Sequence, residues 1–88
     1  PNDPSNLNAA ASSTTAILNW TDNATNEEGT KIERSTDNIN FTEINSTGSN
    51  AVTYTDFSLA PGTYYYRIRA FNIMGNSGYS NTVSVIVP

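Results

Sequence analysis

Residues 59–70, Leu-Ala-Pro-Gly-Thr-Tyr-Tyr-Tyr-Arg-Ile-Arg-Ala, constrain the fold of this chain more than any other stretch. A Pro-Gly pair, typical of a tight turn, leads directly into a run with large apolar residues at alternate positions. This alternation places Tyr64, Tyr66 and Ile68 on one face of a strand and Tyr65 and Arg67 on the other. A tyrosine at such a strand entrance can bury its ring and donate its hydroxyl to the nearby backbone, as in β-sandwiches.

Short alternating runs separated by turn residues occur along the rest of the chain, and no segment keeps a helical periodicity. Residues 1–6 are interpreted as a linker and residues 7–88 as one domain. We expect a first strand at Leu7, Ala9 and Ala11, followed by strands at 15–21, 30–35, 41–44, 51–55, 63–71 and 79–87. Seven strands at this spacing predict an all-β sandwich. Its core should contain Trp20, Ile32, Leu59, Tyr64, Tyr66, Ile68 and Val85.

The composition argues against several classes of function. The chain has no Cys and no His, which excludes disulfides, Cys/His zinc sites and His-activated nucleophiles within it. The net charge is −4 with four basic residues, and no basic run suits nucleic acid. No apolar run approaches the roughly 20 residues of a membrane span. We therefore expect a non-catalytic chain with no catalytic residues, no cofactor, no metal, no nucleic-acid partner and no membrane insertion.

Several motifs occur together and in order along the whole chain. They are Pro4-Ser5-Asn6-Leu7, Leu18-Asn19-Trp20, Asn26-Glu27-Glu28-Gly29, Ile32-Glu33-Arg34-Ser35, the segment at 59–70 and Gly78-Tyr79-Ser80-Asn81. In this respect the chain resembles a fibronectin type III domain of the bacterial and archaeal kind. The resemblance implies a seven-stranded immunoglobulin-like β-sandwich with sheets A-B-E and C′-C-F-G. The Arg-Gly-Asp tripeptide of the animal family is absent, so that adhesive site cannot be carried over.

Two features depart from the family pattern. The interval from Leu59 to the corner tyrosine is one residue shorter than usual, so Tyr64 is assigned to the corner because it shares a face with Tyr66, and Tyr65 is the alternative. The second departure is Ile73-Met74 in the last major loop, where family members carry small or polar residues.

The last major loop is the first candidate contact surface. Exposed apolar residues on a loop indicate a binding surface, and Met packs adaptably there. The predicted contact residues are Ile73, Met74, Asn76 and Tyr79, with Phe57 as a possible extension; the alternative is that the side chains pack over the end of the sandwich.

Charged residues form two further groups. Glu27 and Glu28, with Asp22, could form an acid/base pair or a weak Ca²⁺ site, although solvated side chains are the favoured interpretation. Arg67 and Arg69 should face outward beside Lys31 and Glu33, and cross-strand charge pairing is favoured over a flat face for acidic sugars or a partner domain.

Four Asn-X-Ser/Thr sequons occur, a number that chance alone explains in a chain this rich in Asn, Ser and Thr. Asn23 and Asn45 are the expected acceptors in a glycosylating host, because both should lie in or beside loops.

The chain starts at Pro1 rather than Met, so we expect a piece of a larger secreted or cell-surface precursor. The favoured function is a spacer or interaction module in an extracellular multidomain protein, with neighbouring domains or other subunits as partners. One alternative is self-assembly into a filament or surface layer through the apolar last strand, residues 83–87. Another is a carbohydrate-binding module that uses Tyr65, Phe71 and Tyr79 on a polysaccharide.

Overall fold

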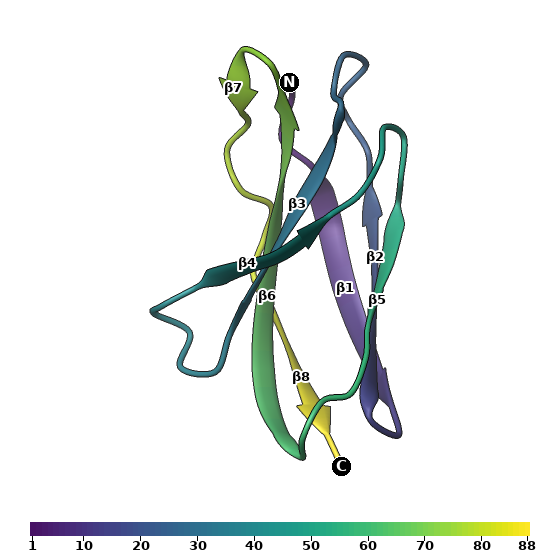
Figure 1. Cartoon of the computed structure of the whole chain (residues 1–88), viewed down its shortest axis with the longest axis vertical. Coiled ribbons are helices and arrows are strands. Elements are labelled where there is room, and N and C mark those ends of the chain that lie inside the picture. Colours follow the sequence, from purple (N-terminus) through teal and green to yellow (C-terminus); the bar gives the residue numbers. More distant parts are fainter.

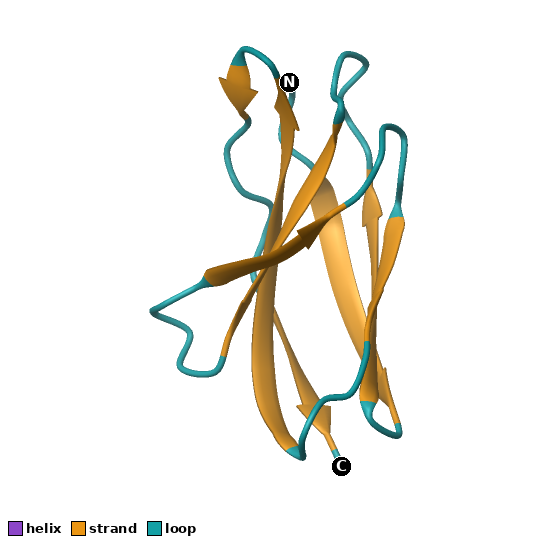
Figure 2. Cartoon of the chain, in the orientation of Figure 1, coloured by secondary structure: helices purple, strands orange, loops and turns teal.

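The computed structural model describes residues 1–88 and contains strands but no helix (Figure 2). Eight strands are present, one more than the sequence predicted, and the additional one is a two-residue hairpin arm. Their bounds are β1 (Ser5–Ser12), β2 (Thr15–Thr21), β3 (Gly29–Ser35), β4 (Thr42–Ser46), β5 (Thr53–Asp56), β6 (Gly62–Asn72), β7 (Gly75–Asn76) and β8 (Val83–Val87).

The strands form two antiparallel sheets that pack face to face (Figure 1). The smaller sheet has the order β1-β2-β5, and the larger has β4-β3-β6-β7, with β8 also paired to β6. In the larger sheet, Ile32 lies opposite Ile68 and Glu33 opposite Arg67. The all-β sandwich with sheets A-B-E and C′-C-F-G is therefore confirmed.

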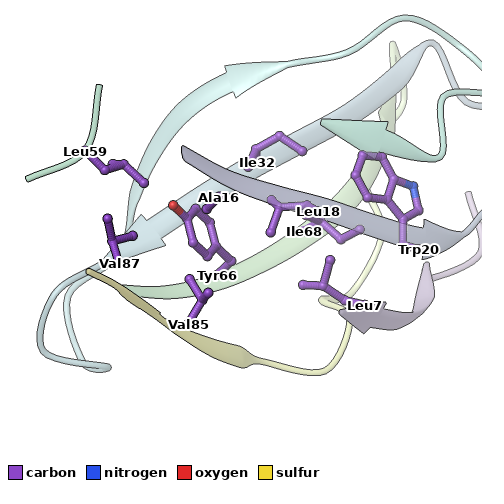
Figure 3. Close-up of a cluster of buried hydrophobic side chains, with 10 residues drawn as sticks. All are labelled: Leu7, Ala16, Leu18, Trp20, Ile32, Leu59, Tyr66, Ile68, Val85 and Val87. Atoms are coloured by element: carbon purple, nitrogen blue, oxygen red, sulfur yellow. The ribbon is translucent and has the colours of Figure 1, made fainter. Parts of the chain in front are cut away.

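The core lies between the sheets and is built from the alternate residues of each strand (Figure 3). Tyr66, Ile68 and Ile32 of the larger sheet meet Leu18 and Trp20 of the smaller one. Burying an aliphatic side chain of this size contributes about 1.5–3 kcal/mol, so these positions carry much of the stability. The remaining buried members of the cluster are Leu7, Ala16, Leu59, Val85 and Val87.

The last strand begins at Val83, four residues later than the alternation indicated. The segment that precedes this strand still runs beside β6. In this segment, serine hydroxyls rather than backbone carbonyls accept hydrogen bonds from the N–H groups of β6. Ser77 Oγ accepts from Ala70 N at 2.9 Å, and Ser80 Oγ accepts from Ile68 N at 3.2 Å. These side-chain bonds satisfy β6 without a regular ladder, which is why residues 79–82 are not a strand.

The N-terminal segment is tied to the sandwich. β1 begins at Ser5, inside the range interpreted as linker, and Asp3 Oδ1 accepts from Gly78 N at 2.8 Å. The N-terminus and the C-terminus lie at opposite ends of the long axis of the molecule (Figure 1). The principal extents are 38 × 23 × 19 Å.

Candidate functional site

The tip of the β6–β7 hairpin carries the most exposed apolar side chains of the chain. Ile73 is 91% exposed and Met74 is 89% exposed. Asn72 shapes the turn, because its Oδ1 accepts from Met74 N at 2.9 Å and its Nδ2 donates to Asn26 O at 3.2 Å. The second of these bonds ties the hairpin to the β2–β3 loop, so two apolar side chains are held in solvent at the end of the molecule that carries the N-terminus.

The other residues predicted for this surface do not all join it. Asn76 lies in β7 and is exposed beside the tip, whereas Tyr79 lies back over the middle of β6 against Arg67 and Arg69. Phe57 is 68% exposed but belongs to the β5–β6 connection, which runs to the end of the sandwich opposite the β6–β7 hairpin (Figure 1). The hairpin tip and Tyr79 are therefore two separate surfaces.

Tyr79 covers a compact ion cluster on the outer face of the larger sheet. Arg67 Nε donates to Glu33 Oε1 at 2.8 Å, Tyr79 Oη donates to Glu33 Oε2 at 2.9 Å, and Arg69 Nη2 lies 3.6 Å from the same Oε2. The predicted pairing of charges between β3 and β6 is thus present, and it includes a tyrosine that the sequence did not place there. Burial, and then the hydrogen bond to Glu33, raise the pKa of Tyr79.

Aromatic rings accompany each cation of this face. The Arg67 guanidinium carbon lies 3.8 Å from the Tyr79 ring centroid and 4.2 Å from that of Phe41. Lys31 Nζ lies 5.2 Å from the centroid of Phe71. The sequence predicted Phe41 only as the start of a strand, and no pattern of alternating residues indicated that its ring would pack on an arginine of β6.

A second polar cluster, missed by sequence reasoning, joins the two sheets. Asp56 Oδ2 on β5 accepts from Tyr66 Oη at 2.6 Å and from Arg34 Nη1 at 2.8 Å. Asp56 is buried, and the Arg34 side chain is about a third exposed. The alternation Ile32-Glu33-Arg34 could have indicated this cluster, since it places Arg34 on the same inner face of the strand as Ile32.

The acidic loop between β2 and β3 differs from the solvated pair that was favoured. Glu27 is buried, whereas Glu28 is exposed. A hydrogen bond with the Asp22 carboxyl group raises the pKa of Glu27, and burial and the charge of Asp22 raise it further. No group of three or more acidic residues gathers in a way that could hold a metal ion.

The two sequon residues differ in their surroundings. Asn23 Nδ2, the atom that would carry a glycan, donates to Asp3 O at 3.0 Å and to Ser5 Oγ at 2.9 Å. Asn45 is exposed and donates only a 3.3 Å bond to Tyr54 Oη. Glycosylation of either remains a prediction, which the intact mass of the protein would test.

An open hollow of about 250 Å³ lies beside the β3–β4 loop. Its lining is polar except for Ile44, and the one charged group, Arg34, is already paired with Asp56. The lining residues are Arg34, Ser35, Thr36, Asn40, Thr42 and Ile44.

No model of a protein family matches the chain, and no curated protein does. Solved structures do match. An Fn3-like protein from Clostridium thermocellum is 27% identical over 100% of this chain and 94% of its own, with a TM-score of 0.83. The FN1–FN3 domains of chicken CNTN1 match at a TM-score of 0.86 and 18% identity, over 99% of this chain and 31% of theirs.

This chain has the fibronectin type III fold. A β-1,2-glucanase from Parabacteroides distasonis contains a region of the same fold, with 26% identity and a TM-score of 0.88. That match covers 98% of this chain and 12% of the glucanase chain. A fibronectin type III domain can therefore form a small part of a much longer protein.

Two surfaces of this domain with the fibronectin type III fold stand out: the apolar hairpin tip of Ile73 and Met74, and the cluster of cations and aromatic rings on the outer face of the larger sheet. No helix of a length and apolarity suited to crossing a membrane is present. Neither surface combines a nucleophile with a base.

Proposed function

We propose that this fibronectin type III domain is a non-catalytic module that links and spaces neighbouring domains of a larger extracellular protein. The observation that carries the proposal is the position of the termini at opposite ends of the 38 Å axis (Figure 1). A chain that enters at one end and leaves at the other separates its neighbours by the length of the module. The small share of the glucanase chain that matches supports the same role.

Apolar side chains at both ends support contacts with those neighbours. Ile73 and Met74 form the tip of the β6–β7 hairpin, at the end that carries the N-terminus, and the exposed Phe57 belongs to the β5–β6 connection, which reaches the end that carries the C-terminus (Figure 1). An exposed apolar group gains free energy when a neighbouring surface covers it. In this proposal the hairpin tip contacts the preceding domain and Phe57 contacts the following one.

An extracellular setting is part of the proposal. The chain has one Lys in 88 residues and a surface rich in Asn, Ser and Thr, a composition suited to secreted proteins. It has no Cys, so its stability does not depend on the redox state of its compartment.

Sedimentation velocity across a wide concentration range tests the proposal against self-assembly. A spacer should remain a monomer of about 9.5 kDa at every concentration. Reversible or open-ended assembly would favour the alternative, in which β8 acts as an open edge, since β8 pairs only with β6 and Ile86 on it is 72% exposed.

Small-angle scattering from two copies joined in series tests the geometry. If the module spaces its neighbours, the longest dimension should be roughly twice the 38 Å axis of one copy. A pair that folds back on itself, with a longest dimension near that of one copy, would contradict the proposal.

A further inference from the structure

The outer face of the larger sheet concentrates positive charge on an acidic protein. The chain has a net charge of −4 and only four basic residues, yet Lys31, Arg67 and Arg69 all lie on this one face. The fourth, Arg34, pairs with Asp56 between the sheets. Beneath the two arginines lies the carboxylate of Glu33, whose side chain is 7% exposed. Glu43, opposite Glu33 on β4, adds a second negative charge to this face, so the three cations exceed the carboxylates by one.

The Arg67 guanidinium is held in one orientation with two groups left free. Phe41 comes from the β4 side of the sheet and Tyr79 from the β8 side, and both ring centroids lie within 4.2 Å of the guanidinium carbon. Nε is occupied by Glu33, and the two Nη groups have no hydrogen-bond partner in the chain. Since the side chain is 30% exposed, these donors present a fixed planar edge to solvent.

Aromatic side chains extend the face along β6 in both directions from Arg67. Tyr65, Arg67, Arg69 and Phe71 are alternate residues of β6 and therefore form one row on the outer face. Tyr65 and Phe71 are half-buried, so neither residue is fully covered, and Lys31 Nζ lies over the Phe71 ring. The row therefore has a flat aromatic ring at each end and two guanidinium groups at its centre.

We propose that this row, together with Lys31, binds an acidic polysaccharide whose sugar rings carry carboxylates. A planar guanidinium edge with two free donors matches a carboxylate, which accepts two parallel hydrogen bonds. Accessible aromatic rings on either side provide flat apolar surface for the sugar rings of the same linear polymer.

Calorimetric titration with polygalacturonate oligomers tests the proposal on the 88-residue chain. Binding is expected, whereas a neutral glucan of equal length and poly-glutamate should bind at least about tenfold more weakly, since each lacks one of the two matched features. Failure to bind polygalacturonate would overturn the proposal. Equal binding of poly-glutamate would also overturn it, because the face would then select any polymeric carboxylate.

Two matched variants separate geometry from net charge. Arg67→Lys keeps the charge but removes the planar edge, and it should weaken binding of polygalacturonate about tenfold or more. Lys31→Gln removes a whole charge but leaves the Arg67 cluster intact, and it should weaken binding less than Arg67→Lys does. The reverse order would show attraction by charge alone and would overturn the proposal.

Tyr65→Thr provides a variant that does not disturb the ion cluster. Unlike the hydroxyls of Tyr64 and Tyr66, the Tyr65 hydroxyl makes no hydrogen bond, and Thr is a good strand residue, so the fold should be retained. Binding of polygalacturonate should weaken severalfold if the ring packs on sugar, whereas unchanged binding would exclude Tyr65 from the site and overturn the proposed row. This outcome is independent of the spacer role, which the monomer and scattering measurements test.

Discussion

Tyr66 Oη lies 2.6 Å from Asp56 Oδ2, and this hydrogen bond joins the two sheets of the sandwich. Tyr66 is fully buried on β6, and Asp56 is buried on β5. The same carboxylate oxygen accepts from Arg34 Nη1 at 2.8 Å, so one atom is shared by a phenol and a guanidinium. Burial first, and then the hydrogen bond to Asp56, raise the pKa of Tyr66 far above its usual range.

This arrangement predicts loss of stability at alkaline pH. The unfolded chain releases the Tyr66 proton near pH 10, whereas the folded chain keeps it. Below about pH 10 the raised pKa therefore does not change the free energy of unfolding. Above about pH 10 this free energy should fall by up to about 1.4 kcal/mol per pH unit. Urea unfolding between pH 8 and 11 measures this slope.

Tyr66→Phe should reduce the alkaline slope, because the group that resists ionisation is gone. At pH 7 the same variant should lower the free energy of unfolding by about 1–3 kcal/mol, since Asp56 loses one of its two donors in a buried site. An unchanged slope in the variant would mean that another tyrosine, such as Tyr79, causes the alkaline loss.

The period-two alternation of residues 63–71 was enough to predict β6 and its inner face, whereas the sheet order was implied by the resemblance to fibronectin type III domains. It could not predict the ion pair of Arg34 with Asp56, because an inward-facing arginine is stable only if the opposite sheet supplies a carboxylate, 22 residues away. The position of Tyr79 in the candidate site was even harder to predict from the sequence. Tyr79 was grouped with Ile73 and Met74 by sequence proximity, but its position depends on Ser77 and Ser80, whose hydroxyls hold the chain against β6.

Tyr64→Phe tests the corner assignment against its alternative. Tyr64 Oη donates to Ala60 O at 2.7 Å, whereas the Tyr65 hydroxyl has no partner in the chain. Removing the Tyr64 hydroxyl should therefore cost about 0.5–1.5 kcal/mol of unfolding free energy, and Tyr65→Phe should cost less than about 0.5 kcal/mol. Urea denaturation followed by circular dichroism compares the two, and equal losses would contradict the assignment.

Two substitutions of Trp20 separate what its volume contributes to the free energy of unfolding from what its polar N–H group contributes. It is buried in the core, and its Nε1 is covered without a hydrogen-bond partner. Trp20→Ala should cost about 3–5 kcal/mol. Trp20→Phe should cost clearly less, because it retains an aromatic ring and removes an unsatisfied donor. Circular dichroism must follow the unfolding, since the only tryptophan is lost, and similar costs for the two variants would refute this interpretation.

Glu27→Gln should stabilise the domain at neutral pH. Because the folded-state pKa of Glu27 is raised above 4.5, ionising this side chain beside Asp22 costs stability as the pH rises through that folded-state value. The neutral amide removes this cost and can donate to the Asp22 carboxylate. The melting temperature should rise by a few degrees at pH 7, and the gain should disappear below pH 4.5. A gain of equal size at both pH values would point to packing rather than charge.

Gly29→Ala tests how closely the first residue of β3 approaches the segment that follows β4. A Cβ at Gly29 would lie 1.9 Å from the backbone oxygen of Thr47 and 2.9 Å from Phe71 Cε1. Thr47 cannot easily move, because its backbone N–H donates to Thr30 O and its hydroxyl accepts from Thr30 N. The substitution should therefore cost about 1–3 kcal/mol or more, as overpacking does. Gly48→Ala is the matched control: a Cβ there meets nothing within 4 Å, so stability should change by less than about 0.5 kcal/mol. Thermal unfolding of both variants gives the comparison, and a Gly29→Ala variant as stable as the control would show that the backbone around Thr47 moves at little cost.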